Sequence, residues 1–553
     1  MKTFFTLLLL TSIFAATAQH TDVYVIQDSV LIPTRSGISL SAIIARKKVN
    51  IQPLPAVIFY TTYYQGKDDD YFAKISADKD YVGLVVYARG IRTNLKYYAP
   101  YENEGKDIYD IIDWVSKQSW CNGSVGMYGG SYTGFSQWAT SKNIHPALKT
   151  IVPQVAVMPG FDVPMENNVI LNLALYWPND NIYRYNPIRR SLPFEWFEHG
   201  SSYRSLDTLA GHPDPIFQKW LEHPAYDTYW RSLVPTPAEF AKINIPVLST
   251  TGYYDGAQIA AVQYFKLHTK YNQKANHYLV IGPYDHWSGQ RGPSPKLMGY
   301  SIDPVANVNM QELAYQWLDY ILKDGRKPEI LVDKVNYQVM GTNEWKHAGS
   351  LDKINNDTLT LYLSNYALSK SKPKNKEYLT QKVDFKDRIN QNNYYTPTIT
   401  FDSLDASNGL VFKTQPFEKD FSINGAFVGN LYATINKKDM DVSIAMYELM
   451  PDGKYFFLTR YVGRASYSKD NTKRELLRPN EVEQILVHNT RFVSKKIAKG
   501  SRLVILLNIN KNPFEVINYG SGKDVNDETI HDANDPLLIK WHNESFLKIP
   551  IWK

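Results

Sequence analysis

The sequence predicts an α/β protein with an inserted helical segment and a separate all-β domain at its C-terminal end. Short apolar runs alternate with helical patterns from Gln19 to about Ala156, which favours a mostly parallel sheet covered by helices. This rhythm breaks between about Met158 and Ala241 and then resumes. Beyond Pro328, short alternating strands with turn signals replace it, a texture typical of a β-sandwich such as a jelly roll. With 553 residues, the chain can form two or three hydrophobic cores.

The first half of the α/β domain, residues 19–157, contains several strands and a clear amphipathic helix. The runs PAVIFYTTYY and VGLVVYARG are β-rich and end in polar or glycine-bearing loops. Between Gly105 and Gln118, isoleucine and valine recur at helical spacing, so one face of this helix should pack on the sheet. Further strands are expected over residues 124–128 and 148–157.

The remaining segments complete the expected domain organisation. Residues 158–241 are rich in Trp, Tyr, Pro and Asn, and we interpret them as a helical cap inserted into the α/β domain. Strands in IPVLSTTGYYDG and HYLVIGPYDHW and a helix over 310–323 predict the second half of that domain, residues 242–327. Residues 328–553 form the expected β-sandwich. Most of the cap tryptophans are expected to pack in the core, with an acyl pocket as the alternative place for them: Trp177, Trp196, Trp220 and Trp230.

The N-terminus predicts export. Residues 1–18 combine Lys2, an apolar stretch and a small-residue site ending at Ala18, which is the pattern of a secretory signal peptide cleaved after Ala18. The expected location is therefore periplasmic or secreted. No later segment has the roughly 18 uninterrupted apolar residues that a spanning helix needs, so we expect no stable membrane insertion.

Composition excludes some classes of partner. The net charge of +6 is not gathered into a basic stripe, which argues against nucleic acid. The single cysteine, Cys121, excludes an intramolecular disulfide and is expected to be a buried small residue. The acidic runs at 68–70 and 524–535 lack metal-loop spacing, so neither a metal nor an organic cofactor is predicted. Assembly into a homo-oligomer stays open.

One serine stands at a predicted strand-to-helix junction, in the segment MYGGSYTGFSQW. Gly129, Gly130 and Gly134 permit a sharp turn that leaves the Ser131 hydroxyl exposed at its tip. The N-terminus of the following helix can supply a backbone N–H to a developing oxyanion. Because glycine–serine turns are common, this motif alone fits a plain turn about equally well.

A serine nucleophile needs a base, and the base needs a carboxylate that orients it. Asp255 follows one apolar strand in VLSTTGYYDG, and His286 follows the next in HYLVIGPYDHW. Read singly, Asp255 fits a helix cap and His286 a surface loop residue. Asp285 competes as the acid, but adjacent side chains on a tight loop diverge, which favours Asp255. The chain order Ser131, Asp255, His286 is the order expected of an α/β hydrolase.

Five segments resemble the CocE/NonD family of serine hydrolases, which includes cocaine esterase, α-amino-acid ester hydrolases and bacterial X-prolyl dipeptidyl peptidases. They are YTTYYQG, YARGIRTN, EGKDIYDIIDWVSKQSWCNGSVGMYGGSYTG, PVLSTTGYYDG and IGPYDHW. Two tail segments, LVFKTQPFEKDFSINGAFVGNLYATI and NKNPFEVINYGSGK, resemble the family's jelly-roll domain. The similarity covers nearly all of the chain after the signal. It implies an α/β-hydrolase domain with an inserted helical cap and a C-terminal all-β jelly-roll domain.

The resemblance also implies a role for each matching residue. Ser131 would be the nucleophile, His286 the general base and then acid, and Asp255 the residue that orients the imidazole. The family's oxyanion hole pairs a tyrosine hydroxyl with the backbone N–H that follows the nucleophile. The matching positions are Tyr63 and Tyr132, with Tyr64 as the alternative to Tyr63 one residue along.

Some positions depart from the family pattern. Tyr87 stands where the family usually has Asp, and Ile91 where it has Arg or Cys. Ala257 and Gln258 occupy positions where the α-amino-ester branch has carboxylates that bind a substrate ammonium. This argues against a selective pocket for a free α-amino group unless carboxylates come from the cap.

The sequence therefore predicts an exported serine hydrolase that cleaves an ester or amide of a small molecule or short peptide through an acyl-enzyme. An X-prolyl dipeptidyl aminopeptidase is one alternative. A non-catalytic glycan-binding protein with a vestigial triad is another. The residues that bind the substrate stay unassigned.

Overall fold

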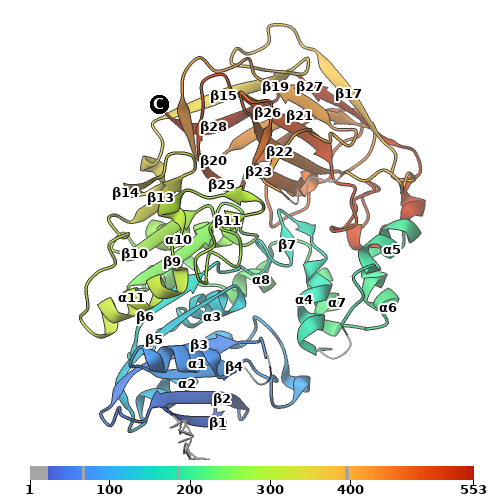
Figure 1. Ribbon diagram of the computed structural model, residues 1–553. Coiled ribbons are helices and arrows are strands. Elements are labelled where there is room, and N and C mark those ends of the chain that lie inside the picture. The colour runs from blue at the N-terminus through green and yellow to red at the C-terminus, as the bar shows by residue number, and fades with distance from the viewer. Residues whose placement is uncertain (1–22, 65, 67–68, 183–186, 393–397) are drawn as a thin grey trace, which may run out of the picture.

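The structure is a computed structural model that describes residues 23–64, 66, 69–182, 187–392 and 398–553. The predicted signal peptide and its cleavage site after Ala18 lie outside the described residues. Figure 1 shows an α/β domain, a group of helices beside it, and an all-β domain that lies against both. The predicted fold class, an α/β hydrolase with a C-terminal all-β domain, is confirmed.

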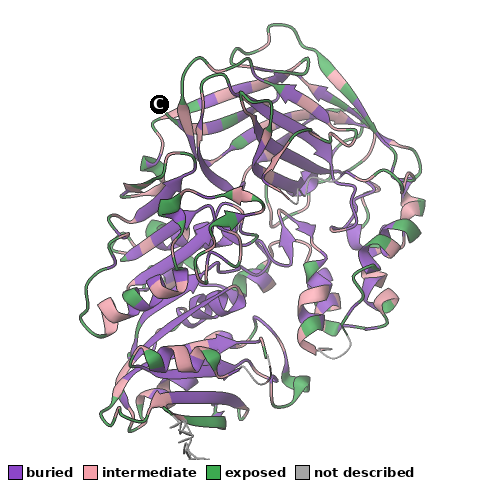
Figure 2. Ribbon diagram, viewed as in Figure 1, coloured by how far each residue is buried: buried purple, intermediate pink, exposed green. Residues whose placement is uncertain are grey.

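A ten-stranded sheet forms the centre of the α/β domain. Its strand order is β1-β2-β4-β3-β5-β6-β9-β10-β13-β14, parallel from β4 to β13 and antiparallel at both edges. The central strands are buried on both faces (Figure 2), as their continuous apolar runs predict. The strands are β1 (Tyr24–Pro33), β2 (Ser39–Lys47), β3 (Leu54–Thr61), β4 (Val82–Tyr87), β5 (Cys121–Gly130), β6 (Leu148–Gln154), β9 (Val247–Gly252), β10 (His277–Gly282), β13 (Val335–Val339) and β14 (Glu344–Ala348).

The sheet continues beyond residue 327, where the sequence pattern placed the end of this domain. Helix α11 (Met310–Leu322) ends just before Gly325 and Pro328. This helix connects two parallel strands of the sheet, so the chain after it returns to the sheet instead of leaving the domain. The next strand, β13, pairs in parallel with β10, and β14 pairs back onto β13. The break in texture at residue 328 therefore lies inside the α/β domain, and the β-domain strands begin at Asp357.

Helices cover both faces of the sheet. One face carries α1 (Tyr71–Asp78) and α11, joined by a hydrogen bond of 2.8 Å between the Ser76 and Tyr315 hydroxyls. The other face carries α2 (Glu104–Ser116), α3 (Tyr132–Thr140) and α10 (Gln258–Tyr271). There the Trp138 ring of α3 stacks on the Tyr264 ring of α10, with centroids 4.7 Å apart. The apolar face predicted for residues 105–118 is fully buried against the sheet.

Short helices form the predicted cap, and side-chain caps begin three of them, with Asp227 capping the helix that starts at Thr228. Asp214 accepts the backbone N–H groups of Ile216 and Phe217, and Thr236 forms a capping box with Glu239. The helices are α4 (Leu173–Ile182), α5 (Leu192–His199), α6 (Leu206–Ala210), α7 (Pro215–Leu221), α8 (Thr228–Leu233) and α9 (Pro237–Phe240), preceded by the small hairpin β7 (Met165–Glu166) and β8 (Val169–Ile170). Three of the four cap tryptophans are core residues, at most 2% exposed: Trp196, Trp220 and Trp230.

Strands, joined by loops and a few 3-10 turns, are the main regular structure of the described part of the C-terminal domain. Apolar and polar residues alternate in several of them, so one face packs inward and the other meets solvent. The strands are β15 (Asp357–Ser364), β16 (Ala367–Ser369), β17 (Tyr378–Val383), β18 (Thr400–Phe401), β19 (Leu410–Lys413), β20 (Phe421–Ala426), β21 (Val428–Ile435), β22 (Asp441–Leu449), β23 (Tyr455–Arg464), β24 (Val482–Val487), β25 (Phe492–Ile497), β26 (Arg502–Ile509), β27 (Leu537–His542) and β28 (Phe546–Trp552).

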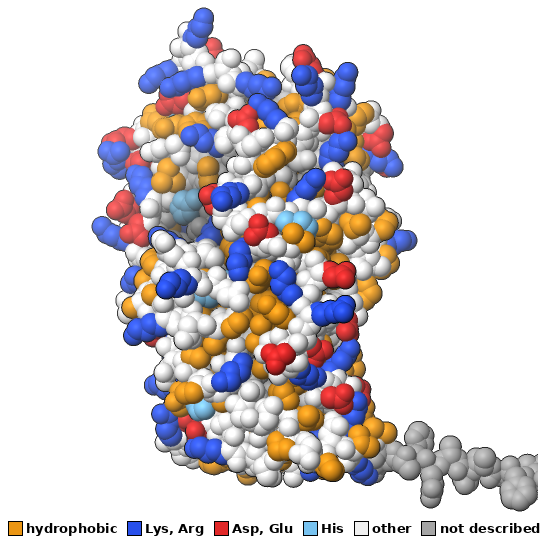
Figure 3. Space-filling view, turned by 90° about the vertical axis from the view of Figure 1, so that its left-hand side faces the viewer, with side chains coloured by type: hydrophobic (Ala, Val, Ile, Leu, Met, Phe, Trp, Pro, Cys, Tyr) orange, Lys and Arg blue, Asp and Glu red, His pale blue; other side chains and the backbone are white. Residues whose placement is uncertain are grey.

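The surface carries mixed charges. On the face in Figure 3, Lys and Arg side chains are interspersed with Asp and Glu and form no continuous basic stripe. Among the described residues, none of the helices has the length and apolar character needed to cross a bilayer.

Candidate active site

Ser131 lies on the sharp turn between β5 and α3. Its backbone φ is +63° and its ψ is −125°, a conformation that residues other than glycine rarely adopt. A Cβ at Gly129 would lie 2.3 Å from Thr133 Cγ2, and one at Gly134 would lie 2.8 Å from the Gln154 carbonyl oxygen. Glycine at these positions therefore lets α3 return close to the sheet, and this turn presents Ser131 at the sheet's carboxyl edge.

Asp255 and His286 meet at the same edge. His286 Nδ1 lies 2.7 Å from Asp255 Oδ1, and the Asp255 side chain is fully buried. Asp255 also accepts hydrogen bonds from the Ala257 backbone N–H and the Thr251 hydroxyl. Because Nδ1 is engaged by the carboxylate, Nε2 is the imidazole nitrogen that can take a proton from a substrate or nucleophile.

Each member of this pair shifts the pKa of the other. Burial alone would raise the pKa of Asp255, but the charge and hydrogen bond of His286 outweigh it and hold that pKa below its usual value. Burial alone would lower the pKa of His286, but Asp255 raises it above the ordinary 6.5. The pair therefore favours an ionised carboxylate and a relatively basic imidazole.

The competing acid, Asp285, is engaged elsewhere. Its Oδ1 accepts the backbone N–H groups of Trp287 and Ser288 and the Ser288 hydroxyl. Asp285 thus caps its own turn, while Asp255 holds the imidazole.

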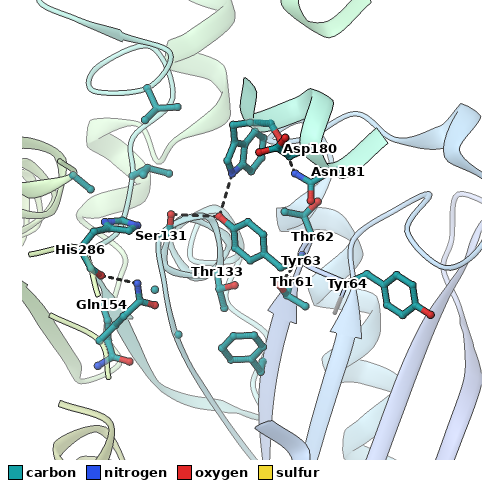
Figure 4. A pocket seen from close by; sticks show the side chains of 18 of the residues that line it. Thr61, Thr62, Tyr63, Tyr64, Ser131, Thr133, Gln154, Asp180, Asn181 and His286 are labelled. Atoms are coloured by element: carbon teal, nitrogen blue, oxygen red, sulfur yellow. Dashed lines mark hydrogen bonds between the residues drawn. The ribbon is translucent and has the colours of Figure 1, made fainter. Parts of the chain in front are cut away.

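Tyr63, on the loop after β3, points at Ser131. Its hydroxyl lies 3.4 Å from Ser131 Oγ (Figure 4). Burial raises the pKa of Tyr63, against the opposing effects of its hydrogen bonds with Ser131, Trp177 and the Tyr132 backbone, so the phenol stays protonated. Tyr64 instead packs edge-on against the Tyr87 ring. Of the two adjacent tyrosines, the structure brings Tyr63 to Ser131.

Tyr132 contributes its backbone at the start of α3, while its side chain is anchored below. The Tyr132 hydroxyl donates to Glu104 Oε1 at 2.5 Å, and Glu104 also accepts the backbone N–H groups of Tyr101 and Asn103. Burial raises the pKa of Glu104 to about 7. This buried carboxyl at the start of α2 therefore fixes the residue that directly follows Ser131.

Ser131, Tyr63 and His286 all line one cavity of about 1030 Å³. The sheet edge supplies one part of its wall, and the cap supplies another, which includes Trp177. The cap also brings three carboxylates to the cavity, Asp162, Glu166 and Asp180.

The β-domain reaches the site through Arg491, which precedes β25 and is 5% exposed. Arg491 Nη1 donates to the backbone carbonyls of Asp255, at 2.8 Å, and Gly256, at 3.0 Å, and Nη2 pairs with Glu166 at 2.5 Å. Beside it, the Gln258 amide exchanges two hydrogen bonds with the backbone of Phe492, both 2.7 Å. One arginine therefore joins the loop that carries Asp255, the cap and the β-domain.

The departures at Tyr87 and Ile91 leave this arrangement intact. The Tyr87 ring packs against Tyr64 and under the Arg92 guanidinium, which lies 5.0 Å from the ring centre. Ile91 is 4% exposed and belongs to the core. Both residues support the floor of the cavity by packing.

Comparison with known proteins defines the class. Residues 36–288 match the sequence profile of the X-Pro dipeptidyl-peptidase (S15 family), and residues 332–532 match the X-Pro dipeptidyl-peptidase C-terminal non-catalytic domain. Cocaine esterase of Rhodococcus sp. (strain MB1 Bresler) is 20% identical over 539 residues, 89% of this chain and 92% of that protein. The protein is thus a serine hydrolase with an α/β-hydrolase fold.

Solved structures agree on the fold. An α-amino acid ester hydrolase superposes with a TM-score of 0.82 at 19% identity, covering 98% of this chain and 100% of that one. An aminopeptidase from a marine sediment Thaumarchaeota archaeon also gives 0.82 at 19% identity, covering 96% and 97%. A CocE/NonD family hydrolase of Staphylococcus aureus gives 0.70 at 16% identity, covering 96% and 94%. The chain belongs to the CocE/NonD family.

Proposed function

We propose that this protein is an exported hydrolase that cleaves carboxylic esters or amides through an acyl-enzyme on Ser131. The contact of 2.7 Å between Asp255 and His286 Nδ1 carries this proposal, because His286 lines the same cavity as Ser131. The signal-like N-terminus supports export. N-terminal sequencing of the mature protein from a bacterial host should then begin at Gln19, and retention of Met1 would contradict export.

The proposed reaction runs in two halves. His286 Nε2 takes the Ser131 proton as Oγ bonds to the substrate carbonyl carbon, and the carbonyl oxygen becomes an oxyanion. The bond to the leaving group then breaks, and His286 returns the proton to the departing oxygen or nitrogen. Water attacks the acyl-enzyme in the same way and releases the acid. Asp255 stabilises the imidazolium in both halves.

The oxyanion would be held by the Tyr63 hydroxyl and the Tyr132 backbone N–H. Removing that hydroxyl in Tyr63→Phe should lower kcat roughly 10²–10³-fold, the usual effect of losing one oxyanion donor. The measurement is steady-state hydrolysis of p-nitrophenyl acetate. Tyr64→Phe is the matched control and should stay within a few-fold of the wild type. A larger loss in the control would assign the donor to Tyr64.

The activity should depend on the protonation of His286. A general base must be neutral, so kcat/KM should fall as pH drops through the pKa of His286. That pKa lies above 6.5 because Asp255 stabilises the imidazolium. In a pH–rate profile from pH 5 to 9, the inflection of the acid limb should therefore lie above pH 6.5. A flat profile over this range would contradict a histidine base.

Cleavage of aminoacyl or peptide substrates is a second candidate function, supported by Asp162. This residue is 2% exposed and lines the cavity, and one of its carboxylate oxygens accepts the Met158 backbone N–H. The other oxygen, Oδ2, has no hydrogen-bond partner among the described residues. Burial raises the pKa of Asp162 well above its usual value, so a cationic group bound beside it would stabilise its ionised form.

A substrate panel separates the two candidates. It compares acetyl and α-aminoacyl p-nitrophenyl esters with an Xaa-Pro anilide, in wild type and Asp162→Asn. If the amino group is recognised, Asp162→Asn should lower kcat/KM for aminoacyl substrates by tenfold or more and leave acetyl esters nearly unchanged. Equal effects on both ester types would reject recognition by Asp162, and release of dipeptides would identify an X-prolyl peptidase.

A further inference from the structure

The Tyr63 phenol oxygen has a second side-chain neighbour besides Ser131. Trp177 Nε1 lies 3.1 Å from this oxygen, and Figure 4 draws both contacts of the phenol as dashed lines. An indole N–H can only donate a hydrogen bond, whereas a phenol has one hydrogen to donate and lone pairs that accept. Trp177 therefore occupies an acceptor position of Tyr63. The single phenolic hydrogen is left for the side where Ser131 lies.

The Trp177 ring is held firmly. It stacks on the Tyr101 ring, with centroids 5.2 Å apart and planes 18° apart, and on the Trp220 ring at 6.2 Å and 23°. It meets the Tyr63 ring edge-on at 87°. The Tyr101 and Trp220 rings also contact each other, with centroids 5.9 Å apart, so the indole is one member of a packed cluster of rings. Packing against these rings restricts rotation of the indole and fixes the direction of its N–H.

We propose that Trp177 is a positioning residue for the oxyanion site. Its N–H fixes the rotation of the Tyr63 hydroxyl, so that the phenolic hydrogen points to Ser131 Oγ and to the oxyanion that forms there. This inference rests on the proposed role of Tyr63. Without Trp177, the phenol oxygen would keep its contact with the Tyr132 backbone but lose the indole N–H, so rotation of the hydroxyl about its C–O bond would be less restricted. Part of the preorganisation that stabilises the transition state would then be lost.

Two further features support this role. Trp177 belongs to α4 of the cap, whereas Tyr63 and Ser131 lie at the sheet edge. The hydrogen bond between Trp177 and Tyr63 therefore forms only when the cap is docked. The hydrogen bond from Trp177 also opposes the effect of burial on the pKa of Tyr63, which makes the phenol a stronger donor than burial alone would allow. A residue that only lined the cavity would neither bond to Tyr63 across this boundary nor change the pKa of Tyr63.

A double-mutant cycle between Trp177 and Tyr63 tests the proposal. Trp177→Phe removes the N–H and keeps an aromatic ring against Tyr101. In the wild-type background it should lower kcat for p-nitrophenyl acetate roughly three- to tenfold, the range for one hydrogen bond, with a smaller change in KM. In the Tyr63→Phe background it should cause no further loss of kcat. Trp196→Phe, at a buried cap tryptophan that packs on Tyr203 and not on Trp177, is the control and should give the same small change in both backgrounds.

The outcomes are distinct. Equal losses of kcat in both backgrounds, a change in KM alone, or no loss at all would overturn the positioning role while leaving the proposed role of Tyr63 intact. A Tyr63→Phe variant with wild-type kcat would instead overturn the oxyanion assignment itself. If Trp177→Phe fails to fold, site-specific replacement of Trp177 by 3-benzothienylalanine keeps the ring shape and removes only the N–H. The same dependence on Tyr63 is then expected, and additive losses would overturn the proposal.

Discussion

Ser131→Ala should reduce turnover about 10⁶-fold, the scale of loss when a serine hydrolase loses its nucleophile. The variant lacks the oxygen that would form the acyl-enzyme, and what rate remains would come from the oxyanion donors and substrate binding. The fold should be retained, because the substitution removes one oxygen and keeps the same backbone at a position already held in a strained conformation. Far-ultraviolet circular dichroism and the melting temperature check this.

A fluorophosphonate probe provides the direct readout. It should label the wild type and not Ser131→Ala. Ser124→Ala, on the same strand β5 and away from the cavity, is the matched control and should label like the wild type. Equal labelling of wild type and Ser131→Ala would reject Ser131 as the nucleophile. Absence of labelling in the wild type would favour the alternative of a binding protein with a vestigial triad.

Asp255→Asn should lower kcat about 10⁴-fold, as replacement of the orienting aspartate does in serine proteases. An asparagine amide facing Nδ1 would favour the imidazole tautomer that presents a hydrogen, rather than a lone pair, to Ser131. It would also remove the charge that raises the pKa of His286. The measurement is kcat for an activated ester at pH 8.

Asp285→Asn is the control for this prediction. Asp285 caps its own turn through hydrogen bonds to Trp287 and Ser288, so its variant should stay within a few-fold of the wild type. A greater loss in Asp285→Asn than in Asp255→Asn would identify Asp285 as the orienting acid.

The chain's local patterns are sufficient to predict the fold and the residues gathered at the sheet edge. Ser131 is recognisable because the glycines around it are required by a turn whose geometry is local. Asp255 and His286 are recognisable because each follows an apolar strand, and parallel strands bring their carboxyl ends to one edge. The domain boundary at residue 328 could not be predicted, because a turn that ends a helix does not reveal whether the next strand rejoins the same sheet.

The supporting contacts were also beyond the sequence. Trp177 and Tyr63 are 114 residues apart, and Arg491 and Asp255 are 236 apart, so no spacing rule connects them. In the sequence, Gln258 is notable only because related enzymes have a carboxylate at this position. In the structure, its amide forms two hydrogen bonds with the backbone of Phe492. Asp162 carries no motif, and its importance lies in burial beside the cavity, which depends on how the cap packs.

The contacts of Arg491 affect how the enzyme loses activity on heating. The buried Arg491 guanidinium of the β-domain bonds to the loop that carries Asp255 and forms an ion pair with Glu166 of the cap. Removing one partner of a buried ion pair destabilises a protein by about 3–5 kcal/mol. Slight separation of the two domains on heating would release this loop before either core melts. Activity should then be lost at a lower temperature than the one at which the protein unfolds. The interface between the two domains, rather than either hydrophobic core, would set the working temperature of the enzyme.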